Sequence, residues 1–192
     1  MTRGFLESWT GVIRLPQETP ATCKLFQRWL YSCDLDNNGI DLKLQRPPEA
    51  PPDFIAIIDL WLFADRREIP LLANNCIVSL RDLIVHHWLL PTSEMQYIYE
   101  RTIPGSPLRR FSIDIMARVW REGNPQPLGG LDFTGEIWQD LAKALVTRPM
   151  LLAKCGLGRM TMCKWHAHAD GGSCATGWSE QWSTEAGAEA RN

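Results

Sequence analysis

The chain has 192 residues, of which 45% are hydrophobic and 22% are charged, and this composition suits one globular domain with a modest core and extensions. A formal net charge of -2, with basic residues scattered along the chain, argues against binding to nucleic acid or to an anionic membrane. No window approaches the roughly 18 apolar residues of a membrane span, and the first residues do not form a signal peptide. We therefore expect an intracellular protein of the nucleus or cytoplasm.

Because we expect an intracellular protein, we expect its cysteines to lie in a reducing compartment. There are six: Cys23, Cys33, Cys76, Cys155, Cys163 and Cys174. In such a compartment free thiols or metal ligands are expected rather than disulfides. Cys23, Cys33 and Cys76 fall on or beside apolar helical stripes, which favours small core residues over nucleophiles.

The first predicted elements are a short strand at residues 12–15 and a helix that follows it. Thr19 can cap this helix with its hydroxyl, while Pro20 occupies a first-turn position where a missing N–H costs nothing. Leu25 and Trp29 then recur on one face of the helix.

A helical hairpin is predicted after the proline-rich stretch at residues 44–53. Residues 52–67 contain no helix breaker, and their apolar side chains surround nearly the whole helical wheel, which is typical of a central helix. The charged residues 65–68 mark where this helix reaches the surface, and Pro70 begins a second helix. Apolar residues recur at helical spacing in the second helix at Leu72, Cys76, Leu80 and Leu83.

Three more helices are predicted downstream. "PTSEMQYIYERT" can form a short helix capped by Thr92 or Ser93. Residues 108–120 form an amphipathic helix, and residues 137–145 form a final one. Beyond these helices the composition becomes polar and glycine-rich, and residues 178–192 are expected to be disordered.

The sequence resembles a known interaction domain. "FLESWTGVIRLPQETPATCKLFQRWLYSCDL" followed by "IDLWLFADRREIPLLANNCIVSLRDLI" is similar to the second half of a BTB/POZ domain, in the form common in fungal proteins. The similarity covers roughly residues 4–90, and "YIYERTIPGSPLRRFSIDIMARVW" extends it to about Trp120. We therefore expect an α+β, mostly helical fold, with a partial BTB/POZ domain at residues 1–90, a helical extension at 91–150 and a Cys/His-containing, largely disordered tail at 151–192.

The resemblance does not include the opening part of a BTB domain, which is a strand, a helix and a central strand pair. BTB proteins form homodimers largely through that part, so their usual dimer does not carry over to this chain. Without it, the apolar helix at residues 52–67 would lose its cover. The sequence predicts either an exposed apolar patch, which invites association, or replacement packing from the C-terminal helices.

A search for catalytic motifs finds no Gly-rich phosphate loop, no G-x-S-x-G and no H-E-x-x-H in the sequence. His86 and His87 are adjacent on a helix, so they point about 100° apart and cannot share a ligand. The charged residues 65–68 are more typical of a solvated helix end than of a partner-binding patch. We expect no enzymatic activity.

One stretch, "CKWHAHADGGSC", carries metal-ligand chemistry. It places Cys163, His166, His168 and Cys174 in a C-x2-H-x-H-x5-C pattern, and all four are zinc ligands by type. In an extended chain His166 and His168 face the same way, and the glycines at 171–172 can turn the chain so that the cysteines meet. The spacing is unlike that of a zinc finger or ribbon, so we favour a polar tail without metal, with a structural zinc site as the alternative.

The leading hypothesis for function is a noncatalytic protein–protein interaction module built on a partial BTB fold, acting as an adaptor or scaffold without a cofactor. The resemblance implies a protein partner, through self-association or a cullin-type ubiquitin ligase. A small structural zinc-binding protein and a truncated BTB gene product without independent activity are the alternatives. The sequence contains no kelch-like repeat array and no DNA-binding finger set, so it indicates no substrate receptor or DNA-reading domain.

Overall fold

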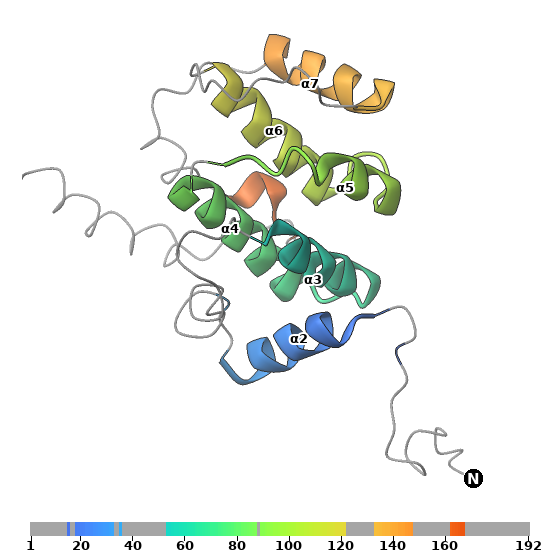
Figure 1. Cartoon of the computed structure of the whole chain (residues 1–192), viewed down its shortest axis with the longest axis vertical. Helices are drawn as coiled ribbons and strands as arrows, with labels where there is room; N and C mark the ends of the chain where they lie inside the picture. Colours follow the sequence, from blue (N-terminus) through green and yellow to red (C-terminus); the bar gives the residue numbers. More distant parts are fainter. Residues whose placement is uncertain are drawn as a thin grey trace, which may run out of the picture.

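The computed structural model describes residues 15, 18–32, 35, 53–87, 89–121, 133–147 and 162–167. The regular elements within these ranges are α2 (Pro20–Ser32), α3 (Phe54–Arg66), α4 (Pro70–His87), α5 (Met95–Arg101), α6 (Pro107–Arg121), α7 (Gly135–Thr147) and the 3-10 turn η1 (Cys163–Trp165) (Figure 1). The expected mostly helical character is confirmed. The predicted strand at residues 12–15 lies outside the described residues except for Leu15, which is not in a strand, so the described part of the chain does not by itself show a BTB/POZ fold.

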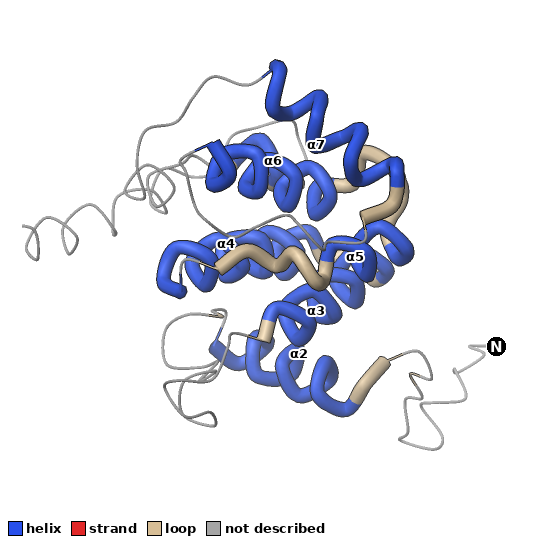
Figure 2. The backbone as a smooth tube through the Cα atoms, turned by 45° about the horizontal axis from the view of Figure 1, so that its top comes forward, coloured by secondary structure: helices blue, strands red, loops and turns tan. Residues whose placement is uncertain are grey.

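The helices form three layers, which Figure 2 shows from a second direction. α3 and α4 make the middle layer, α2 lies against one side of it, and α5, α6 and α7 lie on the opposite side. η1 packs against α6, beside α4. None of the helices in the described ranges is long and apolar enough to cross a membrane.

α3 is buried on nearly all sides, as its apolar residues predict. Asp53 caps its N-terminus by accepting a hydrogen bond from the Ala56 amide at 3.1 Å. Its buried side chains are Phe54, Ile57, Ile58, Leu60, Trp61, Leu62, Phe63 and Ala64. α2 and α4 provide most of the cover, and Tyr97 of α5 adds a hydrogen bond from its hydroxyl to Asp59. Each large apolar side chain of the described helix α3 is buried or half-buried. The predicted exposed apolar patch on α3 therefore does not occur. The C-terminal helices provide only part of the cover that the sequence analysis expected from them.

A tight turn joins α3 to α4. The Ile69 amide donates to the Ala64 carbonyl at 2.9 Å. The Glu68 amide donates to the Asp65 carbonyl at 3.2 Å, which completes the Schellman pattern of a helix C-terminus. Glu68 sits in the left-handed region with a φ of 54°, the position that usually carries glycine. Pro70 then opens α4 as predicted, and the two helices form the expected hairpin.

α2 begins at the cap that the sequence predicts. The Thr22 amide donates to the Thr19 hydroxyl at 3.1 Å, and Pro20 is the first helical residue. The helix packs on α3 through Phe26, whose ring centroid lies 4.7 Å from that of Phe63. These contacts fix the helix against the hairpin.

The remaining helices confirm two predictions and correct one. Ile137 and Leu141 of α7 are fully buried, as their spacing predicts, and α6 spans the stretch expected to be amphipathic. The predicted cap of the short helix by Thr92 or Ser93 is wrong. Glu94 is the N-cap residue and makes no side-chain cap hydrogen bond, while the Ser93 hydroxyl donates to the Glu94 carboxylate at 2.9 Å.

Candidate functional site

The two adjacent histidines lie in the last turn of α4. Their rings are nearly perpendicular, with centroids 4.8 Å apart. His86 is exposed and His87 is half-buried. Across the described part of the chain, no three His, Cys, Asp or Glu side chains are grouped so that they could hold a metal ion. The pair therefore gains no third ligand from the residues that the structure describes.

The predicted zinc ligands are only partly described. Cys163 is the first residue of η1, and His166 is the residue directly after η1. The His166 amide donates to the Cys163 carbonyl at 3.3 Å. His168 and Cys174 lie outside the described residues. The four-ligand site therefore stays a prediction.

The cysteines on or beside the apolar stripes were expected to be small core residues and not nucleophiles. Cys76 is fully buried in α4, and burial raises the pKa of its thiol well above the ordinary value. Cys23 is half-buried, and Cys33 lies outside the described residues. Cys23, Cys76 and Cys163 form no disulfide. A thiol held protonated by burial, as in Cys76, is a poor nucleophile and acts as a small core residue.

The charged residues 65–68 are all exposed, as expected for a helix end. The Arg66 guanidinium lies 2.7 Å from the carboxylate of Glu18, just before α2. Burial raises the pKa of the Asp65 carboxyl, an effect that the neighbouring Arg66 opposes. The guanidinium of Arg67 lies 5.7 Å from the centroid of the Phe63 ring. Two of the four charges thus contact the chain itself, which favours a helix end over a partner-binding patch.

Arg109 is the centre of a polar network that joins α5, α6 and α7. Its guanidinium donates to the Thr102 hydroxyl at 2.8 Å, to the Tyr99 carbonyl at 2.5 Å and also to the Thr102 carbonyl. A further nitrogen lies 2.6 Å from the Glu136 carboxylate of α7. The guanidinium also sits over the Tyr99 ring, 4.3 Å from its centroid. Arg109 is buried and uses its donors on the protein itself, so this cluster is structural.

A second network fixes η1 to α6. Asp114 of α6 is only 1% exposed, and its Oδ2 accepts from the Lys164 ammonium at 2.7 Å and from the Trp165 indole nitrogen at 3.1 Å. The Trp165 ring is fully buried and packs edge-on against Phe111, with centroids 5.4 Å apart. Lys164 lies over the Trp165 ring at 4.0 Å. One carboxylate therefore binds both side chains of a Lys-Trp pair.

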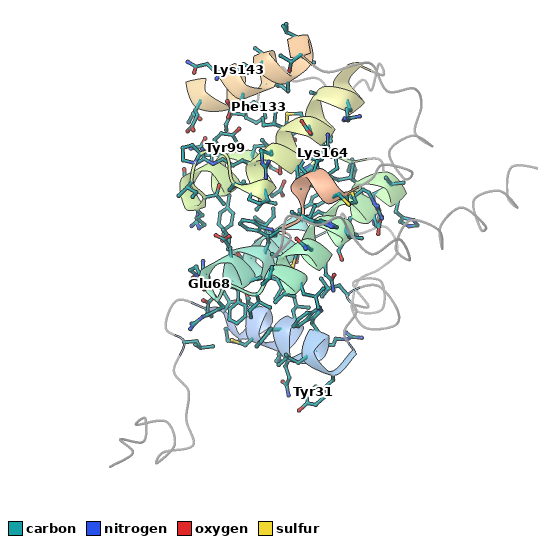
Figure 3. All side chains as sticks on the ribbon, turned by 180° about the vertical axis from the view of Figure 1, so that it is seen from behind. Tyr31, Glu68, Tyr99, Phe133, Lys143 and Lys164 are labelled. Carbon is teal, nitrogen blue, oxygen red and sulfur yellow. The ribbon has the colours of Figure 1, made fainter. Side chains whose placement is uncertain are left out.

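Asn74 of α4 holds the end of the same segment. Its amide nitrogen donates to the Ala167 carbonyl at 3.0 Å, and its amide oxygen accepts from the Ala167 N–H at 2.8 Å. These are the two hydrogen bonds that a neighbouring strand would make with one residue. Residues 162–167 thus carry the chain back to α4 and α6, as Figure 3 shows for Lys164.

The C-terminal end of α2 presents apolar side chains to solvent. Leu30 is 54% exposed and Tyr31 is 86% exposed, and Figure 3 shows Tyr31 pointing away from the body of the protein. The neighbouring Trp29 is buried, and its indole nitrogen donates to the Asn75 amide oxygen at 3.0 Å once that amide is oriented to accept it. The same amide then donates to the Leu71 carbonyl at 3.3 Å. An anchored helix therefore holds two solvent-facing apolar side chains in place.

The sequence did not single out Arg109, Asp114 or Trp165. A signal was present for Asp114, because it lies three residues after Phe111 and so falls on the apolar stripe of its helix. An acidic residue on such a stripe indicates a buried partner. The partner, Trp165, lies 51 residues away and has no periodic context that would mark it. Only the folded chain brings the two together.

Comparison of the chain with protein-family models, with curated proteins and with solved structures gave no match. Function is therefore argued from the sequence and from the geometry above.

Proposed function

We propose that this chain is a noncatalytic protein–protein interaction module that binds a protein partner through the apolar side chains at the C-terminal end of α2. The observation that carries the proposal is the exposure of Leu30 and Tyr31 beside the buried Trp29. A tyrosine with an apolar neighbour is typical of the side chains that dominate binding energy at protein interfaces. Fixing them on a packed helix lowers the entropy lost when a partner binds.

The resemblance to BTB/POZ domains supports the same class of function. α2 lies within the first stretch that carries the resemblance, and the second stretch covers most of the α3–α4 hairpin. We propose on this basis that the chain is a partial BTB/POZ domain with an adaptor or scaffold role. Self-association and a cullin-type ligase are the partners that this family relationship suggests, and the binding itself needs only surface complementarity.

The test compares two surface variants of the full chain. Leu30→Ser/Tyr31→Ser removes the proposed contact, and Val146→Ser is the matched control because Val146 of α7 is also 86% exposed. Proteins copurified with each variant from cells that express the chain are quantified by mass spectrometry, and self-association is followed by light scattering after size exclusion. We expect the double variant to lose at least about tenfold of one copurified protein, or of its own dimer, while the control keeps it. Equal recovery with both folded variants would rule out this surface.

A structural zinc site is the second candidate, and one observation favours it. Cys163 and His166 lie in the segment that Trp165 and Asn74 hold against the helices, so two of the four predicted ligands have a fixed backbone. Such anchoring reduces the entropy lost on metal binding. Zinc measured in the purified protein should be one per chain and should be lost in Cys163→Ser. A metal-free wild type after purification with added zinc would rule this candidate out.

A further inference from the structure

The segment at residues 162–167 is recognised by side chains in the way that a docking site recognises a peptide. Asp114 accepts from one ammonium and one indole N–H, at 2.7 and 3.1 Å. Asn74 makes both hydrogen bonds to the backbone of Ala167. The site thus selects a cation, an aromatic side chain and an extended backbone, in that order along the peptide. None of these contacts is a helix or sheet hydrogen bond between consecutive elements.

The burial of Asp114 favours the state in which residues 162–167 occupy the site. Its carboxylate is 1% exposed, and the segment supplies it with one positive charge and one neutral donor. A buried carboxylate that loses two such donors is destabilised. The site therefore favours any chain that brings a Lys-Trp pair to it, whether its own or that of another molecule.

The connection to the segment is long enough for another molecule to supply it. Residues 148–161 separate α7 from the segment, and a chain of this length spans up to about 50 Å when extended. A second copy carries the same Lys164–Trp165 pair and the same Asp114 site. Exchange of an identical segment between copies needs no new interface, because each contact made within one molecule is made again between two.

We propose that the surface of α4 and α6 around Asp114 and Asn74 is a peptide-docking site, and that two copies of this chain dimerise by exchanging residues 162–167 between their sites. The dimer contains two copies of the geometry described above, with Trp165 of one copy packed on Phe111 of the other. The exchange does not use Leu30 or Tyr31 of α2. Failure of the α2 surface and failure of the exchange are therefore distinguishable.

A charge-swapped pair of full-length variants tests the exchange. Asp114→Lys alone faces its own Lys164 with a like charge, and Lys164→Glu alone faces its own Asp114 with a like charge. When the two variants are mixed, an exchanged heterodimer pairs opposite charges at both sites. Light scattering after size exclusion should show twice the chain mass in the mixture and mostly monomer in each variant alone. Monomers in the mixture, with both variants folded by circular dichroism, would overturn the proposal.

A matched control and a second measurement keep the test decisive. Lys24→Glu reverses a charge on an exposed position of α2 and keeps the wild-type site and segment, so it should form its own dimer, and Asp114→Lys mixed with it should stay monomeric. If Asp114→Lys does not fold, full-length Trp165→Ala is titrated with a fluorescent peptide of residues 160–169 in which Cys163 is replaced by serine. Binding should saturate, and a peptide with Trp165→Ala should bind at least about thirtyfold more weakly. Absence of binding to the folded variant would equally overturn the proposal.

Discussion

The guanidinium of Arg109 lies 2.6 Å from the carboxylate of Glu136, and this pair joins α6 to α7. The two side chains differ in their surroundings, because that of Arg109 is 6% exposed while that of Glu136 is 50% exposed. For that reason we expect Arg109 to contribute more to the free energy of unfolding than Glu136. Its other donors reach two backbone carbonyls at the end of α5.

Replacing Arg109 should therefore cost much more than replacing Glu136. Arg109→Met leaves the Tyr99 and Thr102 carbonyls without their charged donor, and we expect a loss of about 2–4 kcal/mol in the free energy of unfolding. Glu136→Gln should cost less than about 1 kcal/mol, since solvent screens a half-exposed pair. Urea denaturation of both variants measures the difference. Equal losses would mean that the ion pair, rather than the carbonyl contacts, holds α5 and α7 to α6.

The Tyr99 hydroxyl predicts a loss of stability in alkali. It donates to Asp140 at 3.0 Å, and burial, followed by this hydrogen bond, raises its pKa well above the ordinary value of 10.0. A pKa that is higher in the folded state means that this contribution is complete below pH 10 and is lost as the pH rises above it. Urea denaturation between pH 8 and about 11 should show a steeper decline for the wild type than for Tyr99→Phe. The pKa of Tyr97 is also raised, by burial and by Asp59. The stability of Tyr97→Phe should therefore also decline less steeply with pH than that of the wild type.

Asn75 should be coupled to Trp29 across α4 and α2. Asn75→Ala leaves the buried Trp29 indole N–H without its acceptor, and we expect a cost of about 1–3 kcal/mol. Trp29→Phe removes the donor, so the double variant should be more stable than the sum of the single losses predicts. A coupling free energy of about 0.5–1.5 kcal/mol from thermal or urea unfolding would show the bond. Strict additivity would show that the two side chains do not interact.

Glu68 offers a stabilising substitution. Its φ of 54° places a residue with a Cβ where glycine is relaxed, at the C-terminus of α3. Glu68→Gly should raise the free energy of unfolding by about 0.5–1 kcal/mol. Glu68→Ala is the control, because it removes the charge but keeps the Cβ, and it should not stabilise. A gain with alanine as large as with glycine would assign the effect to the charge instead.

Much of the helical order was predictable from local signals. Thr19 with Pro20 marked the start of α2, and Pro70 marked the start of α4, because capping hydroxyls and prolines act within a few residues of chain. The cap of α5 was mispredicted for a related reason. Thr92 and Ser93 both have the chemistry of a cap, but Ser93 uses its hydroxyl on Glu94. Side-chain competition of that kind is decided by rotamers that a pattern does not contain.

The cover of α3 and the candidate surfaces were not predictable in the same way. The apolar wheel of α3 required cover, but nothing in its own residues specified α2, α4 or α5. Leu30 and Trp29 are neighbours in the sequence and both are apolar, yet one is exposed and the other buried. The difference arises from the direction in which α2 lies on the hairpin.

The sequence by itself determined the helical segments, the hairpin and the central position of α3, because these follow from spacing, caps and breakers that act over a few turns. Tertiary structure alone decided that Asp114 meets Trp165, that Asn74 binds Ala167, and that Tyr31 faces solvent. Each of these depends on the relative placement of helices that are far apart in the chain. Such placement is set by the fit of whole surfaces, and no local pattern of residues encodes it.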